Sequence, residues 1–178
     1  ADFTIPTYIA STRLLVKSDS GIKSVYDLAG KTVVMTKGTT QETLFAEINK
    51  NHTLRAKTVL GNTHDESFAL LEAGKADAFM LNDILLASVR STSKTPDRYV
   101  LTRDPLTIDP LSLTLRKNDD AFRKIVTGEI HRLITQGEIN GMYRKWFESP
   151  IPPNQVNLKL PMSYLLRDSF KSPTEWLP

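Results

Sequence analysis

Three consecutive stretches of the sequence repeat one pattern: a short β-branched apolar run, then a polar turn, then apolar residues at helical spacing. The stretches are residues 32–48, 57–74 and 78–91. Strands that alternate with helices in this way form a parallel sheet whose faces the helices cover. The sequence therefore predicts an α/β fold, with a three-layer, open, mostly parallel sheet flanked by helices.

The starts of the predicted helices indicate where a ligand would bind. Thr39 with Glu42, and Thr63 with Glu66, have the spacing of a capping box, and each pair follows a strand. In an open parallel sheet, ligands bind outside the carboxyl ends of the strands, where helix N-termini point free N–H groups outward. We therefore expect the three strand-to-helix junctions to lie on one rim and to border one crevice. The junctions are residues 36–39, 63–64 and 82–83, with helix starts at Thr39, His64 and Asn82.

The remaining segments predict three short extended stretches and two helices. Residues 8–17 predict a strand, and residues 98–102 and 111–116 predict strands or connectors. Two helices should follow, one capped by residues 118–120 and one over residues 139–147. The tail after Pro153 has no clear period, so we expect it to be irregular.

Composition excludes several classes of function. The 23 basic and 20 acidic residues are scattered along the chain, so a nucleic-acid partner is not expected. The absence of Cys excludes disulfides, thiolate catalysis and sulfur-ligated metals. No apolar stretch approaches the roughly 20 residues of a membrane-spanning helix. His52, His64 and His131 occupy unrelated positions, so neither a metal site nor a cofactor is expected.

Several motifs carry a family resemblance along nearly the whole chain. They are Asp2-Phe3-Thr4, Thr12-Arg13-Leu14-Leu15, Lys37-Gly38-Thr39-Thr40, Ala76-Asp77-Ala78-Phe79, and Tyr143-Arg144-Lys145-Trp146-Phe147 with Pro150-Ile151-Pro152-Pro153. In this order and spacing, they resemble the glutamate/aspartate-binding proteins of bacterial amino-acid ABC transporters. These are periplasmic (type II) solute-binding proteins and not enzymes. They have two α/β lobes joined by two crossover strands, trap an amino acid between the lobes and deliver it to a permease in the inner membrane.

The resemblance also implies a domain organisation. Residues 1–20 would be the end of lobe I and the first crossover strand, and residues 21–103 the ligand-binding lobe II. Residues 104–117 would form the return crossover, and residues 118–178 the C-terminal helices and tail that would pack on lobe I. Because the first residues match a point just before the first crossover, the resemblance implies that most of lobe I and the signal peptide are not part of this sequence, and the absence of an initiator Met agrees with this.

The resemblance places Thr36, Thr39, Arg13 and His64 in the ligand site. Two hydroxyls at a helix start suit a carboxylate, although Thr39 could also be a plain helix cap. Arg13 and His64 match residues that contact the side-chain carboxylate of the ligand. From the residues alone, Arg13 could instead be a solvent-facing edge residue, and His64 a surface residue. Weaker candidates for ligand contact are Ser11, Thr12 and Thr40.

Asn82 departs from the family pattern. It occupies the place of an aspartate that grips the α-ammonium of the ligand, and an amide lacks that charge. Asp83 follows directly and could be only a helix cap; alternatively, the register is shifted by one residue and Asp83 grips the ammonium instead. The exact ligand therefore stays open between glutamate, aspartate and a compound without an amine.

Two further expectations complete the prediction. A dehydratase-like enzyme on the same fold is the alternative function; His64 would be its only candidate acid or base, and no nucleophile or phosphate motif supports it.

The aromatic residues Phe122, Tyr143, Trp146 and Phe147 lie at helical spacing and predict core. Because the lobe they would pack on is missing, we expect self-association through the C-terminal helices, including by domain swapping.

Overall fold

The computed structural model describes residues 1–153 and 155–173 and divides the chain into two compact units. One unit is Ser11–Thr107, and the other combines Ala1–Ala10 with Ile108–Pro178. The predicted strand over residues 8–17 is in fact two strands, β2 (Tyr8–Ala10) and β3 (Thr12–Lys17). They belong to different units because they pair with different partners, so the single-strand prediction was wrong.

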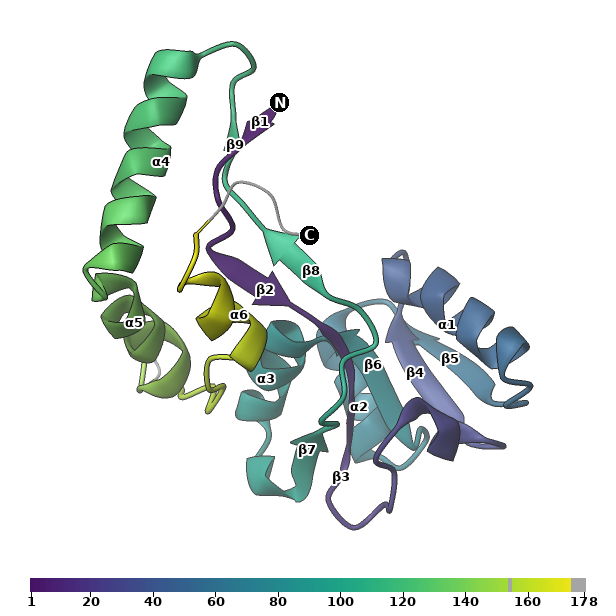
Figure 1. Cartoon of the computed structure of the whole chain (residues 1–178). Coiled ribbons are helices and arrows are strands. Elements are labelled where there is room, and N and C mark those ends of the chain that lie inside the picture. Colours follow the sequence, from purple (N-terminus) through teal and green to yellow (C-terminus); the bar gives the residue numbers. More distant parts are fainter. Residues whose placement is uncertain (154, 174–178) are drawn as a thin grey trace. The chain divides into compact units, whose positions relative to one another are not determined.

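The unit Ser11–Thr107 is built on a five-stranded sheet with the order β5-β4-β6-β3-β7 (Figure 1). Its other strands are β4 (Thr32–Thr36), β5 (Lys57–Gly61), β6 (Ala78–Asn82) and β7 (Tyr99–Leu101). Strand β4 runs parallel to β5 and β6, whereas β3 is antiparallel to β6 and β7. The sheet is therefore mostly parallel, as predicted, with one reversed strand.

Helices cover both faces of this sheet, which gives the predicted three layers. They are α1 (Thr40–Asn51), α2 (His64–Glu72) and α3 (Asp83–Thr92), with short 3₁₀ turns at Val25–Leu28 and Pro96–Arg98. Alternate residues of β4 face opposite sides: Met35 packs with Phe45 of α1, and Val34 packs with Phe68 of α2. The rigid three-layer core fixes where the helix starts lie.

The two predicted capping boxes turned out differently. The Thr63 hydroxyl accepts from the backbone N–H of Glu66 at 3.1 Å, as predicted, but the Glu66 carboxylate accepts from the backbone N–H of Asn62 and not from that of Thr63. The Thr39 hydroxyl makes no cap bond and donates to the carbonyl of Thr36 at 2.7 Å, so that capping prediction was wrong. The Glu42 carboxylate accepts instead from the backbone N–H of Gly38. The loop before α1 is thus tied to the end of β4.

The second unit contains two short antiparallel pairs and three α-helices within its described residues. Its strands are β1 (Asp2–Phe3), β2, β8 (Asp109–Leu111) and β9 (Thr114–Leu115), paired as β1 with β9 and β2 with β8. Its helices are α4 (Asp120–Thr135), α5 (Glu138–Tyr143), a π turn at Arg144–Glu148, and α6 (Tyr164–Ser169). The predicted strand over residues 111–116 is split between β8 and β9. The tail predicted as irregular contains α6, whose start is capped by the Ser163 hydroxyl.

The C-terminal aromatic residues are only partly core. Tyr143 is buried against Ile9, Met162 and Leu166. Phe122 and Trp146, however, are 50% and 46% exposed. The prediction that Phe122 and Trp146 belong to the core was therefore wrong. The cluster formed by Ile5, Ile130 and Ile134 does not include them. None of the helices within the described residues is long and apolar enough to cross a membrane.

Candidate functional site

The three predicted helix starts lie along one edge of the five-stranded sheet. Thr36 and Gly61, the last residues of β4 and β5, are paired in register. The imidazole Nδ1 of His64 lies 2.8 Å from the Thr36 hydroxyl, which joins the start of α2 to the end of β4. Asn82, at the end of β6, is joined to the first turn of α1 through Gln41. The prediction of a single rim is confirmed.

A chain of hydrogen bonds runs inward from His64. The Thr36 hydroxyl lies 2.9 Å from the hydroxyl of Ser67, which in turn donates to the carbonyls of Thr63 at 2.9 Å and Met35 at 3.3 Å. Thr36 and Ser67 are buried, whereas His64 is half-buried. These hydrogen bonds hold the Nδ1 side of the His64 imidazole against the protein. Its Nε2 makes no hydrogen bond within residues 1–153 and 155–173.

Gln41 organises the middle of the rim. Its amide nitrogen donates to the Thr12 hydroxyl at 3.2 Å and to the Asn82 amide oxygen at 3.0 Å, and the residue is only 4% exposed. Thr12 and Asn82 are also paired across β3 and β6. Gln41 is not among the predicted site residues, because a glutamine in the first turn of a helix is common on protein surfaces. Its burial at the end of a parallel sheet is visible only in the folded chain.

Arg13, Ser11 and Asp83 form a second polar group at this edge. Arg13 Nε donates to the Ser11 hydroxyl at 2.8 Å, and that hydroxyl donates to Asp83 Oδ2 at 2.7 Å. The guanidinium and the carboxylate are also paired at 4.0 Å. Asp83 is buried, and its other oxygen accepts from the backbone N–H of Ile84 at 2.8 Å. The buried carboxylate therefore has the charged partner that burial requires.

Arg13 is held by the backbone on its other side. Its Nη1 donates to the carbonyl of Thr102 at 2.8 Å and to the carbonyl of Arg103. Strand β3 lies between β6 and β7, so the interpretation of Arg13 as an edge residue was wrong. The side chain is 20% exposed, and no described residue accepts a hydrogen bond from Nη2. A planar guanidinium fixed in this way is suited to a carboxylate.

Thr39 and Thr40, the other predicted residues, lie at the junction between β4 and α1. Thr39 is half-buried and its hydroxyl is already engaged, whereas Thr40 is exposed at the first position of α1. The rim thus presents a guanidinium, an imidazole, an amide and a helix start. Within the described part of the chain, no group of three or more histidine, aspartate or glutamate side chains is arranged to hold a metal ion.

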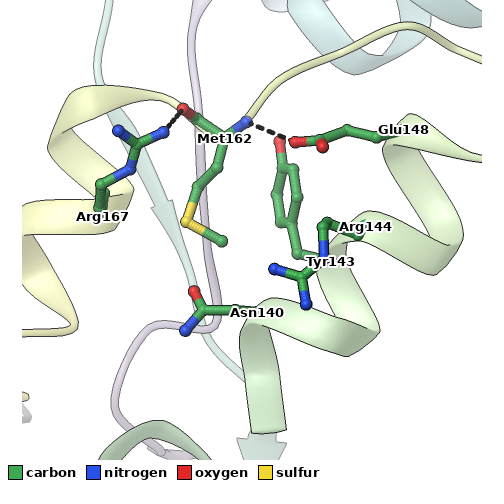
Figure 2. Close-up of a pocket in the computed structure, with 6 residues that line it drawn as sticks. All are labelled: Asn140, Tyr143, Arg144, Glu148, Met162 and Arg167. Carbon is green, nitrogen blue, oxygen red and sulfur yellow. Dashed lines mark hydrogen bonds between the residues drawn. The ribbon is translucent and has the colours of Figure 1, made fainter. Parts of the chain in front are cut away.

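A separate pocket lies in the other unit and contains none of the predicted site residues. It has a volume of about 320 Å³, and Figure 2 shows the six side chains around it. The backbone of Met162 joins two of these side chains. Its N–H donates to the Glu148 carboxylate at 3.4 Å, and its carbonyl accepts from the Arg167 guanidinium at 3.4 Å. The lining residues are Asn140, Tyr143, Arg144, Glu148, Met162 and Arg167.

The fold agrees with the comparisons with known proteins. The chain belongs to the bacterial extracellular solute-binding proteins, family 3, whose model matches residues 1–149. It is 40% identical over 174 residues to the L-glutamate/L-aspartate-binding protein of Pseudomonas aeruginosa, and 37% identical over 175 residues to the glutamate/aspartate import solute-binding protein of Salmonella typhimurium. Both alignments cover 98% of this chain but 58% of the relative. The predicted family resemblance is confirmed.

A solved structure supports the same assignment. An ancestral cationic amino acid solute-binding protein is 28% identical, with a TM-score of 0.68 over 83% of this chain and 62% of that chain. The two relatives are named as binding proteins and not as enzymes, in agreement with the predicted non-enzymatic class. The comparisons do not support the predicted self-association through the C-terminal helices.

Proposed function

We propose that this chain carries the ligand-binding rim of a receptor for an ABC importer, and that the rim binds glutamate or aspartate. The observation that supports this function is the meeting of three strand-to-helix junctions at one sheet edge, where His64 and Thr36 are 2.8 Å apart. The amino acid would lie in the cleft between two lobes. The receptor would then deliver it to a permease in the inner membrane; the Salmonella typhimurium relative is named for glutamate/aspartate import.

Arg13 has the main part in selecting an acidic ligand. Its Nε and Nη1 are occupied by Ser11 and by two backbone carbonyls, so the guanidinium is oriented before the ligand arrives. Nη2 remains to donate to the side-chain carboxylate of the ligand. The start of α1 adds a dipole interaction with an anionic group, and Thr36, Thr39 and Thr40 lie at that helix start.

Asn82 would receive the α-ammonium group of the ligand. Its amide oxygen accepts one hydrogen bond from Gln41, and a carbonyl oxygen can accept a second. A neutral acceptor contributes roughly half as much as a carboxylate, so the ammonium is held less strongly than an aspartate would hold it. Asp83 is buried and bonded to Ser11 and Ile84, so its part is to hold Arg13 in place through Ser11. Thr12 does the same for Gln41.

The location of the receptor belongs to the same proposal. Family membership, together with the solute-binding names of the relatives, supports a periplasmic protein that is exported across the inner membrane.

Calorimetry with L-glutamate, L-aspartate, L-glutamine and L-arginine tests the proposed function. The acidic amino acids should bind more tightly than the other two. Arg13→Gln should weaken the binding of glutamate by about 30-fold or more, because the ligand carboxylate loses a charged partner, a loss of about 2 kcal/mol at least. Arg55→Gln is the matched control, because Arg55 is exposed and precedes β5 at the opposite edge of the sheet.

Two results would contradict the proposal. Tighter binding of arginine or glutamine than of glutamate would refute the acidic ligand. NMR spectra of the amino acid during incubation would show whether the protein consumes it. Consumption would support the dehydratase-like alternative instead.

A further inference from the structure

The hydrogen-bond chain that ends at His64 has more links than its hydroxyl groups have hydrogens. Its links are His64 Nδ1 to Thr36 Oγ1 at 2.8 Å, Thr36 Oγ1 to Ser67 Oγ at 2.9 Å, and Ser67 Oγ to backbone carbonyls at 2.9 and 3.3 Å. A carbonyl can only accept, so the single hydrogen of Ser67 points to Thr63 and Met35. Thr36 must then donate its own hydrogen to Ser67. No hydroxyl hydrogen remains for the link to His64.

We propose that Ser67, acting through Thr36, fixes His64 in the tautomer that carries its hydrogen on Nδ1. The imidazole must donate the missing hydrogen to Thr36, and in a neutral ring this leaves Nε2 as a lone-pair acceptor. Ser67 is fully buried and lies in α2 directly inside the rim. It is therefore a positioning residue for recognition, although it does not reach the ligand itself.

The tautomer determines what His64 can bind, and this step rests on the proposed function. A neutral imidazole with a bare Nε2 accepts a hydrogen bond from an ammonium, amide or hydroxyl group, but it repels a carboxylate. To donate to the side-chain carboxylate of glutamate or aspartate, Nε2 must gain a proton. Binding of an acidic amino acid to the neutral imidazole of His64 therefore takes up a proton.

Several charged groups lie on the elements around His64. On the elements that pack against α2, Asp83 is bonded to Ser11, and Arg90 lies in the last turn of α3. Lys57 and Asp77 lie at the start of β5 and directly before β6, at the opposite edge of the sheet. The charged residues on the junctions near His64 are Lys37, Glu42, Asp65 and Glu66. Of these, Glu42 and Glu66 accept backbone hydrogen bonds from Gly38 and Asn62.

The tautomer is measurable in the free chain by long-range ¹H–¹⁵N NMR of the imidazole rings at pH 8. His64→Gln assigns the signal among the three histidines. We expect a protonated Nδ1 and an unprotonated Nε2 in the wild type. In Ser67→Ala, Thr36 is free to donate to Nδ1, so the signal should move toward the opposite tautomer. If Ser67→Ala does not fold, Thr36→Val removes the same constraint. A hydrogen on Nε2 in the wild type would overturn the proposal.

Proton uptake tests the consequence for the ligand. Titration of L-glutamate at pH 8 in phosphate and in Tris, which differ in ionisation enthalpy, should show uptake of about one proton per bound ligand. Ser67→Ala should reduce this uptake. Ser91→Ala should not, because it removes a serine bonded to a carbonyl elsewhere in the same unit. Tight binding of glutamate without proton uptake would refute the proposed role of His64. Absence of glutamate binding would refute the proposed function, and the NMR result would still decide on the tautomer.

Discussion

Gly61 is the position where a single added methyl group should do the most damage to the rim. A Cβ at this residue would lie 2.4 Å from the Ser67 hydroxyl oxygen, 2.6 Å from its backbone nitrogen and 2.9 Å from its Cα. The hydroxyl could rotate away, but two of the three atoms are backbone or Cα. Gly61→Ala therefore forces α2 away from the end of β5. This movement disturbs the hydrogen bond between Ser67 and Thr36 and the one between Thr36 and His64.

The size of the effect follows from the cost of overpacking a core. Such changes typically cost about 1–3 kcal/mol. With a slope of about 2 kcal/mol per molar urea, a loss of 2 kcal/mol lowers the unfolding midpoint by about 1 M. Urea titrations followed by circular dichroism would measure the shift. Gly128→Ala is the control, because a Cβ there meets nothing within 4 Å and alanine favours a helix interior. A Gly61→Ala midpoint equal to wild type would refute the argument.

Two further perturbations have expected outcomes. Gln41→Ala leaves Thr12 and Asn82 without their buried donor and should lower the free energy of unfolding by about 1–3 kcal/mol in urea titrations, whereas Glu47→Ala on the exposed side of α1 should be nearly neutral. Burial, with a contribution from Glu72, raises the pKa of the Tyr99 phenol, so its neutral form is favoured in the folded state. The stabilisation by the neutral Tyr99 phenol is fully present below the unfolded-state pKa of about 10 and is lost as the pH rises through the folded-state pKa. Tyr99→Phe should therefore remove this alkaline loss of stability in thermal melts. An unchanged midpoint for Gln41→Ala, or an unchanged alkaline profile for Tyr99→Phe, would contradict these assignments.

The parts of the fold that could be predicted from the sequence are those with a local pattern. The β-branched runs and the helical spacing of residues 32–91 predict three strand-to-helix units, and the structure contains them at nearly the same residues. Residues 8–17 read as one strand because nothing in their composition marks the change of partner after Ala10. That change depends on β8 pairing with β2, about 100 residues further along the chain.

The candidate site was predicted less completely than the fold. Arg13 and Thr36 stand out by chemistry or by resemblance, and the structure brings them to the same sheet edge. Gln41 and Ser67 do not stand out, since both are ordinary helix residues in the sequence. Their importance comes from burial at the edge of the sheet, where each connects two rim residues or fixes the hydrogens of one. Sequence pattern cannot supply such contacts between segments.

The most direct test of the proposed acidic ligand is a map of backbone amide shifts during a titration with L-glutamate. The largest ¹H–¹⁵N changes should occur at Arg13, Thr36, Thr39, His64 and Asn82, with little change in residues 120–135 of α4. L-Arginine at the same concentrations should leave these signals nearly unchanged. A response to arginine but not to glutamate, or glutamate-induced shifts confined to the other unit, would contradict the assignment of this rim as the site for an acidic amino acid.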